Sequence, residues 1–264
     1  MKKILLILPL LFLSIVIAAQ TNNKTGSKPD WLLSGYTEGY EGNDFDFIDN
    51  EVIFWSEYTS EELYRSDYHF ETENSMTYLV LPGASKRLLC LANDIVCLLY
   101  DNASSEPYFM GFWSLGGSER IDPFQSTDFS ASSELKEGAI TYGAGNLASF
   151  NLKTPWVEGV DGNGIGEYVT FRMNFTYLYL FSGYISYDKP YLYEQNARPK
   201  KIKITVTDKG NSQEFIFDLE DTPNPQTLTF PDWMKGEAKL EILEVYPGTK
   251  YQDTCIHALL GRVF

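Results

Sequence analysis

Residues Lys201–Thr207 read KIKITVT, and this stretch decides the fold class of the second half of the chain. Ile202, Ile204 and Val206 alternate with lysine and threonine residues. Strict alternation is typical of a strand that buries one face, because successive side chains point to opposite sides of a sheet. The next segment, Glu214–Leu219, repeats the same period. The two segments therefore predict half-buried strands.

Further strand-like segments flank this pair, and no segment shows a sustained helical period. The chain contains 18 Tyr, 17 Phe and 5 Trp, and aromatic residues are enriched in strands. We therefore predict an all-β fold, with a β-sandwich in the second half. Its other expected strands are Glu167–Met173, Tyr177–Ile185, Lys239–Tyr246 and Thr254–Phe264.

The first half contains shorter segments of the same kind, separated by turn residues such as Pro82-Gly83 and Asn93-Asp94. Short strands with regular turns indicate a smaller antiparallel β domain, a meander arranged as a small barrel or a sandwich. We place this domain at 30–122 and the second at 128–264, because Ser114–Thr127 is rich in boundary residues. The expected strands are Trp31–Glu38, Phe45–Trp55, Tyr68–Glu73, Thr77–Leu81, Arg87–Ala92, Ile95–Tyr100 and Tyr108–Phe112.

The first residues predict the cellular compartment. Two lysines precede an apolar run from Ile4 to Ile17, and small residues follow before Gln20. This pattern is typical of a cleaved secretory signal, and the run is shorter than the roughly 20 residues of a membrane span. We expect a signal peptide at 1–19 and a polar linker at 20–29, with an uncleaved anchor as the alternative. The mature protein is then secreted, periplasmic or at the cell surface, without an integral membrane span.

The formal net charge is -15. Affinity for nucleic acid comes mainly from lysine and arginine neutralising phosphates, so this balance excludes nucleic acid as a partner. It also disfavours an anionic membrane surface. The charge is explained more simply as a solubility feature of an exported protein.

Two of the three cysteines are candidates for a disulfide. Folding the chain at Asn93-Asp94 places Cys90 opposite Cys97, and an exported chain favours oxidation of such a pair. Buried reduced thiols are the alternative. Cys255 is expected to be a small buried apolar residue.

The residues needed for common catalytic sites are scarce. His69 and His257, the two histidines, lie far apart in the sequence, so a nucleophile with a histidine base is not expected. The cysteines and histidines also lack metal-site spacing. Carboxylates are abundant, which keeps glycoside hydrolysis open as a minor alternative. The glycines of Gly162–Gly166 are expected to permit positive φ in a tight connection.

Motifs spread over about half the chain, from Ser130 to Leu259, carry a family resemblance. Two are specific: WVEGVDGNGIGE at Trp156–Glu167 and VYPGTKYQDTCI at Val245–Ile256. The shorter ones are Ser130-Ala131-Ser132-Ser133, Tyr142-Gly143, Asn146-Leu147, Thr154, Gly183-Tyr184, Tyr193, Asn196 and Arg198-Pro199-Lys200. In this order they resemble the coagulation factor 5/8 type C, or discoidin, superfamily. Within it they are similar to the glycan-binding translocation domain of secreted NAD glycohydrolases.

The resemblance implies a galactose-binding-like jelly roll whose loops, at one end, hold carbohydrate. It implies no enzyme, because nothing between Thr21 and Ser126 is similar to the catalytic half of an NAD glycohydrolase. That region is instead loosely similar to lipocalins, with Trp31, Gly35 and a meander, which implies a barrel.

The chain departs from the family pattern at two positions where related domains have acids that help to hold calcium. It has Ser149-Phe150-Asn151 in place of Asp-Gly-Asp, and Ala258 in place of a glutamate. Calcium prefers several oxygen ligands, above all carboxylates. We therefore expect no structural calcium and no other metal or cofactor.

Sugar sites combine an aromatic surface with a few polar groups that bind hydroxyls. The Tyr-rich segment Ser186–Pro199 is expected to be a binding loop. The preferred ligand contacts are Tyr184, Tyr193, Asn196 and Arg198. The full set of candidates adds Trp156, Glu158, Asp161, Tyr251 and Asp253. The alternatives are a core position for Trp156, a turn cap for Asp253, and a scaffold ion pair of Arg198 with Glu158 or Asp161.

Three functions remain open at this point. The first is an exported, non-enzymatic protein whose C-terminal domain binds a glycan or a cell-surface protein. The second is a small-ligand carrier that uses a cavity in the N-terminal β domain. The third, least favoured, is a glycoside hydrolase with two carboxylates about 5–10 Å apart in one cleft.

Overall fold

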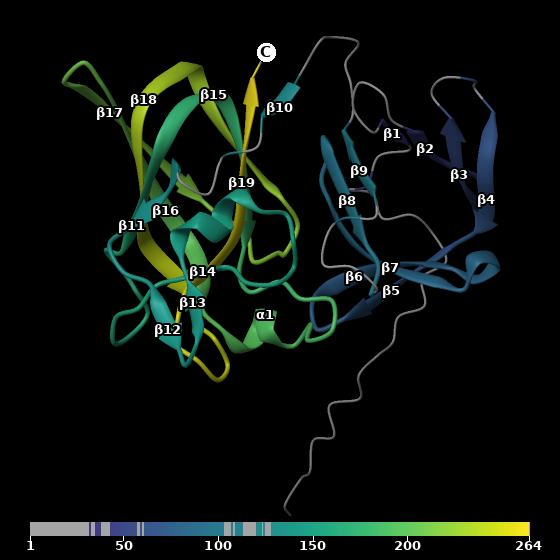
Figure 1. Ribbon diagram of the computed structural model, residues 1–264, viewed down its shortest axis with the longest axis horizontal. Helices are drawn as coiled ribbons and strands as arrows, with labels where there is room; N and C mark the ends of the chain where they lie inside the picture. Colours follow the sequence, from purple (N-terminus) through teal and green to yellow (C-terminus); the bar gives the residue numbers. More distant parts are fainter. Residues whose placement is uncertain are drawn as a thin grey trace, which may run out of the picture.

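The computed structural model describes residues 32, 35–37, 43–56, 59, 61–102, 107, 109–112, 120–122, 124 and 128–263. The expected signal peptide and linker lie outside these residues. The described part is almost entirely antiparallel β-structure, in two main sheets of nine and eight strands that lie side by side (Figure 1). The all-β fold class is thus confirmed. None of the helices in this part is both long enough and apolar enough to cross a membrane.

The nine-stranded sheet, here called the N-terminal sheet, is built from two meanders. The first runs through β1 to β4, the second through β5 to β9, and β1 joins them by pairing with β9. The strands are β1 Gly35–Thr37, β2 Asn43–Ile48, β3 Glu51–Ser56, β4 Glu62–Asp67, β5 His69–Glu73, β6 Met76–Leu81, β7 Lys86–Ala92, β8 Val96–Tyr100 and β9 Phe109–Phe112.

The expectation of a lipocalin-like barrel is wrong, because this sheet stays open with β4 and β5 at its two edges. Tyr68 alone separates these two strands in the chain. A hairpin needs a connection of at least about two residues, so β4 and β5 cannot fold back to pair with each other. They form the two arms of a corner instead. Tyr68 is buried at this corner, with its ring 4.8 Å from Phe47 and 5.7 Å from Phe70.

One face of the N-terminal sheet carries a cluster of buried apolar side chains that includes Val52, Leu79 and Leu88. Burial of this face stabilises the sheet by roughly 25 cal/mol for each Å² of apolar surface removed from water. The described side chains of this cluster pack against one another.

The expected register of the β7–β8 hairpin is also wrong, because Cys90 and Cys97 do not lie directly opposite each other. Cys90 lies opposite Leu99, and Cys97 lies opposite Ala92, so the hairpin register is shifted by two residues. The reason is the turn: the Asn93 amide donates to the carbonyl of Val96, which makes a four-residue loop. Both thiols are free and buried in the apolar cluster, and Cys255 is likewise free and buried.

The second sheet, here called the C-terminal sandwich, has the strand order β10-β19-β15-β18-β16-β17. Because β10 pairs with β19, residues 120–122 belong to this sheet, although we expected them in the first domain. Two long strands, β15 and β18, connect its layers (Figure 1). The elements are β10 Arg120–Asp122, β11 Ser130–Ala131, the hairpin β12 Leu135–Glu137 and β13 Ile140–Tyr142, β14 Trp156–Val157, β15 Tyr168–Ser182, α1 Leu192–Gln195, β16 Arg198–Asp208, β17 Asn211–Asp218, β18 Gln226–Tyr246 and β19 Cys255–Val263.

The KIKITVT stretch lies in β16 as expected. Ile202, Ile204 and Val206 are buried in the core of the sandwich, while the intervening lysines and threonine are partly exposed. β17 pairs with it in an antiparallel arrangement, with Ile204 opposite Phe215. The period of two in the sequence thus specifies which side of the sheet faces the core.

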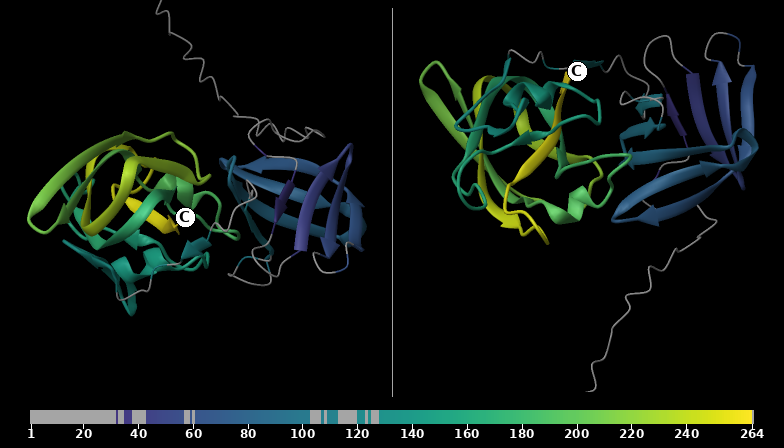
Figure 2. Two further views of the ribbon diagram at one scale, coloured as in Figure 1. Left: turned by 90° about the horizontal axis from the view of Figure 1, so that it is seen from above. Right: turned by 60° about the horizontal axis from the view of Figure 1, so that its bottom comes forward.

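The two sheets share a third cluster of buried apolar side chains. It joins Tyr78, Leu91 and Leu98 of the N-terminal sheet to Tyr179 and Phe181 of the sandwich. Hydrogen bonds accompany this contact, including one of 2.7 Å from the Tyr100 hydroxyl to the carbonyl of Phe150. Both views in Figure 2 show the two sheets side by side. Burial of apolar surface together with satisfied polar groups indicates a fixed contact.

Candidate functional site

A pocket of about 370 Å³ lies at one end of the C-terminal sandwich. Three separate segments form most of its wall: the β12–β13 hairpin, residues 184–196 with α1, and residues 250–253 before β19. In Figure 1 the hairpin and α1 lie at the same end of the sandwich. Loops held by a rigid scaffold are common positions for ligand sites. The pocket is therefore the first candidate for a functional site.

Four tyrosines give the pocket its aromatic surface: Tyr142, Tyr184, Tyr191 and Tyr251. Tyr142 and Tyr184 contact each other edge to face, with ring centroids 6.3 Å apart. Burial is the main cause that raises the pKa of both hydroxyls. Tyr191 and Tyr251 keep 42% and 38% of their surface exposed, so their rings remain accessible to a ligand.

Polar side chains complete the lining: Glu137, Lys189, Gln195, Asn196, Lys250 and Asp253. Two are already engaged within the protein. Glu137 accepts a 3.2 Å hydrogen bond from the Tyr142 hydroxyl, and Asn196 donates one of 2.8 Å to the carbonyl of Leu192. The ammonium of Lys250 lies 4.7 Å from the centre of the Tyr251 ring. Lysines and acids are thus balanced in number.

The short helix α1 fixes two walls of the pocket at once. Its carbonyls at Glu194 and Gln195 accept hydrogen bonds of 2.9 and 2.8 Å from the amides of Thr249 and Tyr251. A Cβ on Gly248 would lie 2.6 Å from the carbonyl carbon of Asn196, so only glycine permits this close approach. The segment that carries Lys250 and Tyr251 is therefore held against α1.

Four of the nine candidate residues line this pocket: Tyr184, Asn196, Tyr251 and Asp253. They come from two segments that are about 55 residues apart in the sequence, and the fold brings them together. The segments are those that the resemblance pointed to.

Tyr193 and Arg198, which were expected to contact a ligand, do not line this pocket. Arg198 is 8% exposed and forms a bidentate ion pair with Asp221. The Tyr193 hydroxyl donates to the same carboxylate at 3.1 Å, and its ring packs in the cluster between the two sheets. Burial is the main cause that raises the pKa of Tyr193. Both side chains therefore stabilise the scaffold behind α1.

Trp156 and Glu158 are also buried and do not line the pocket, and Trp156 takes the core position that was its alternative. The indole N–H of Trp156 donates to the carbonyl of Ser133 at 3.1 Å, and the ring belongs to the core. Glu158 accepts hydrogen bonds from the amides of Val160 and Thr254, at 2.9 and 3.1 Å. Burial raises the pKa of Glu158, and the two amides act in the opposite direction.

The glycine-rich connection folds over Glu158, whose carboxylate accepts from the Val160 amide and lies against Gly164. Gly162, Gly164 and Gly166 all have positive φ, as expected from the sequence. The Thr254 hydroxyl donates to the carbonyl of Asn163 at 2.7 Å, which closes the loop onto β19. Asp161 is exposed on this loop and does not line the pocket.

The sequence argument missed several lining residues, among them Tyr142, Tyr191 and Lys250. Tyr142 and Lys250 both lie within motifs that carry the resemblance, and Tyr191 lies within the predicted binding loop. The sequence therefore indicated which segments line the pocket, but not which of their side chains do. In the segment with α1, the side chains that face the pocket are set by a single helical turn, and four residues are too few to show a periodic pattern.

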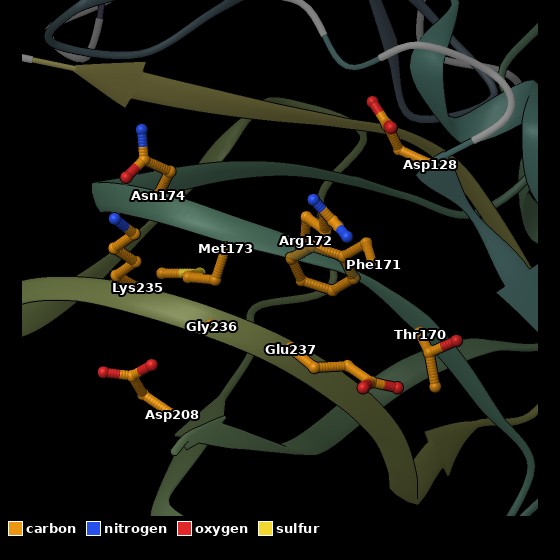
Figure 3. Close-up of a pocket in the computed structure, with 10 residues that line it drawn as sticks. All are labelled: Asp128, Thr170, Phe171, Arg172, Met173, Asn174, Asp208, Lys235, Gly236 and Glu237. Atoms are coloured by element: carbon orange, nitrogen blue, oxygen red, sulfur yellow. The ribbon is translucent and has the colours of Figure 1, made fainter.

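A second pocket of about 610 Å³ lies between β15 and β18, away from these loops. Figure 3 shows its lining side chains, of which Arg172 and Glu237 lie opposite each other in the register of the two strands. Phe171, the one aromatic among the described residues that line it, is 2% exposed and belongs to the core. The described lining therefore offers no exposed ring face for stacking against a sugar.

The described residues contain no group of three or more His, Cys, Asp or Glu side chains arranged to hold a metal ion. Asn151, at the place of the expected acidic segment, uses its side-chain oxygen to accept a 3.1 Å hydrogen bond from the Lys153 amide. Ala258 is buried in the cluster between the sheets.

Comparison with known proteins identifies one family and several similar folds. The model of the NAD glycohydrolase translocation F5/8 type C domain matches residues 123–260. No curated protein matches the chain. A family 32 carbohydrate-binding module of C. perfringens NanJ, solved in complex with galactose, is 16% identical over 55% of this chain and 99% of that chain, with a TM-score of 0.41. The C-terminal domain of a chitobiase from Bacteroides fragilis is 16% identical over 53% and 96%, with a TM-score of 0.38.

Proposed function

Because the chain belongs to the NAD glycohydrolase translocation F5/8 type C domain family, we propose that it is an exported, non-enzymatic protein that binds carbohydrate in its tyrosine-lined pocket. The observation that carries the proposal is the lining of that pocket. Exposed rings of Tyr191 and Tyr251 stand beside polar side chains on three converging segments. The apolar face of a sugar ring packs on such rings, and hydroxyls bind the polar groups.

The polar groups suit a neutral sugar. Asp253 offers oxygens that accept hydrogen bonds from hydroxyls, and Lys189 and Lys250 offer donors. Hydrogen bonds to charged groups are the stronger kind. Because the pocket carries two lysines and two acids, it has no excess of either charge to bind an ionic ligand. Tyr184 and Asn196 also line the pocket and add an aromatic ring and a carboxamide.

Two further parts of the proposal have their own support. Export is supported by the pattern of the first 19 residues, and a surface glycan or glycoprotein is the partner that an exported protein meets. A non-enzymatic role is supported by the family match, which covers the translocation domain. Incubation with NAD and with aryl glycosides tests this part directly. We expect no release of nicotinamide or of aglycone, and turnover that follows the purified protein would contradict it.

A glycan array with the full chain tests the binding. The first variant is Tyr251→Ala, which removes an exposed ring from the pocket. The matched control is Tyr168→Ala, because Tyr168 also carries a lysine over its ring, with Lys239 at 4.5 Å, but lies on β15 outside the pocket. Loss of one stacking ring is worth about 1 kcal/mol, which is roughly a fivefold loss of affinity.

The proposal expects selective binding that Tyr251→Ala weakens and Tyr168→Ala leaves unchanged. Equal binding by both variants and the unmodified protein would place the ligand elsewhere. Absence of binding to every glycan on the array would overturn the carbohydrate assignment.

A further inference from the structure

The segment that forms one wall of the pocket also contacts the N-terminal sheet. The Tyr187 hydroxyl donates a 2.6 Å hydrogen bond to the carbonyl of Arg87 on β7. In return, the Tyr78 hydroxyl on β6 donates to the carbonyl of Tyr187 at 3.4 Å, and the two rings meet edge to face. The Arg87 guanidinium covers the other side, 3.4 Å from the centre of the Tyr78 ring. Tyr187 is thus held by its ring, its hydroxyl and its carbonyl.

A second contact reaches α1 itself. The Ser75 hydroxyl, in the turn between β5 and β6, donates a 2.7 Å hydrogen bond to the carboxylate of Glu194. Ser75 has a φ of 65°, a left-handed conformation that is costly for a residue other than glycine. Tyr193, the preceding residue of α1, packs in the apolar cluster that both sheets share. One turn of helix therefore has contacts with the N-terminal sheet through two consecutive side chains.

α1 depends on these contacts for its position. It has four residues, and a single helical turn is unstable alone because nucleation fixes several residues for one hydrogen bond. Leu192 and Gln195 of this turn line the pocket. Its carbonyls at Glu194 and Gln195 hold the amides of Thr249, Lys250 and Tyr251. A continuous set of contacts therefore runs from the N-terminal sheet through α1 to the backbone of Tyr251.

We propose that the N-terminal sheet is a positioning part of the pocket: through Ser75 and Tyr187 it holds α1, and α1 holds the segment with Lys250 and Tyr251. This inference rests on the proposed function for its biological meaning. It assigns a role to the N-terminal half that does not require a ligand or a catalytic site of its own. Ser75, Tyr187 and Glu194 are positioning residues, and none of them lines the pocket.

The contact between the sheets also supplies a matched control. The Tyr100 hydroxyl donates a 2.7 Å hydrogen bond to the carbonyl of Phe150. Phe150 precedes β14 and lies outside the segment that carries α1. Tyr100→Phe and Tyr187→Phe each remove one hydroxyl across the same contact and keep the ring. They differ in whether the lost bond ends on the segment that carries α1.

Amide hydrogen exchange in the full chain tests the inference without any ligand. The double variant Ser75→Ala/Tyr187→Phe is compared with Tyr100→Phe and with the unmodified protein. Loss of two hydrogen bonds should raise the exchange rates of the Thr249, Lys250 and Tyr251 amides about tenfold. Tyr100→Phe should leave these three amides unchanged. Unchanged rates in the double variant, or an equal rise in Tyr100→Phe, would overturn the inference.

Binding supplies a second readout, with a glycan retained by the array as the probe. The double variant should bind it at least about fivefold more weakly than the unmodified protein, and Tyr100→Phe should bind it equally well. Normal affinity in the double variant, despite faster exchange at the three amides, would overturn the link between α1 and the ligand. If no glycan binds the unmodified protein, the proposed function fails, while the exchange result still decides whether the N-terminal sheet positions the pocket wall.

Discussion

Arg198 and Asp221 are joined by two hydrogen bonds of 2.6 Å, one from Nε to Oδ1 and one from Nη2 to Oδ2. The other terminal nitrogen of Arg198 donates to the carbonyls of Tyr193 and Asn196, at 3.4 and 3.2 Å. One buried guanidinium thus connects the end of α1 to the loop before β18. Because α1 carries pocket residues, this ion pair supports the wall of the pocket from behind.

Removal of the Asp221 carboxylate should destabilise the protein strongly. Asp221→Ala leaves the Arg198 charge buried without its partner, and we expect a loss of about 2–3 kcal/mol of unfolding free energy. The control is Asp218→Ala, whose side chain is 80% exposed in its pair with Lys201. An exposed pair contributes about 0–1 kcal/mol. Urea denaturation measures both, and equal losses would contradict a structural role for Arg198.

Substitution of Gly164 should destabilise the protein more than substitution of Gly138, a glycine with a similar backbone conformation. Gly164 and Gly138 have φ of 64° and 60°, so an added Cβ strains both alike. At Gly164 that Cβ would lie 2.7 Å from Glu158 Cδ, and at Gly138 nothing lies within 4 Å. Gly138→Ala should cost about 1 kcal/mol, and Gly164→Ala about 2–3 kcal/mol more. Thermal denaturation compares them, and similar melting temperatures would show that Glu158 does not fill this loop.

His257 should make the fold sensitive to mild acid. The ring is 2% exposed, and burial lowers its pKa to about 4 even though Nε2 donates to the Asn151 carbonyl at 3.1 Å. In the unfolded chain the pKa is about 6.5, so the unfolded state binds the proton first as the pH falls. The stability contributed by neutral His257 is complete above pH 6.5. It decreases by about 3 kcal/mol as the pH falls to about 4.

The variant His257→Gln keeps a donor for Asn151 and cannot titrate. The difference in unfolding free energy between the unmodified protein and this variant should therefore change between pH 7 and pH 4, while shared contributions from carboxylates cancel. Urea denaturation at both pH values gives that difference. A constant difference would show that His257 is not a buried neutral imidazole.

Calcium should leave the stability unchanged. Where related domains have acids, this chain has Asn151, whose oxygens accept hydrogen bonds from Lys153 and His257, and the buried methyl group of Ala258. A cation that prefers carboxylates finds too little negative charge there. The melting temperature should be equal in millimolar calcium and in EDTA. A rise with calcium that EDTA reverses would contradict this expectation.

The strands and their buried faces could be predicted from the sequence because a period of two is a local signal. Ile202, Ile204 and Val206 show it directly. The register of the β7–β8 hairpin could not be predicted, since it depends on one side chain. The Asn93 carboxamide oxygen accepts hydrogen bonds of 2.8 Å from the amides of Ile95 and Val96, which favours a four-residue turn. That turn places Cys97 diagonally across the hairpin from Cys90 and not directly opposite it.

The candidate site was predictable as a set of segments but only partly as a set of side chains. Tyr184 and Tyr251, which were expected as ligand contacts, line the pocket. Arg198 does not, because its partner Asp221 is 23 residues away and no local pattern links them. The open edge between β4 and β5 was missed for a similar reason. Whether a sheet closes depends on pairing between distant strands, which no local pattern shows. The feature that prevents closure here is the one-residue connection at Tyr68.

The central claim is that the tyrosine-lined pocket holds carbohydrate, and backbone amide chemical shifts during titration with a glycan retained by the array test it most directly. Our account predicts that the largest changes fall in the β12–β13 hairpin, in residues 184–196 and in residues 250–253. It also predicts little change along β15 and β18, where the second pocket lies. Saturable changes confined to β15 and β18, or to the N-terminal sheet, would contradict the claim.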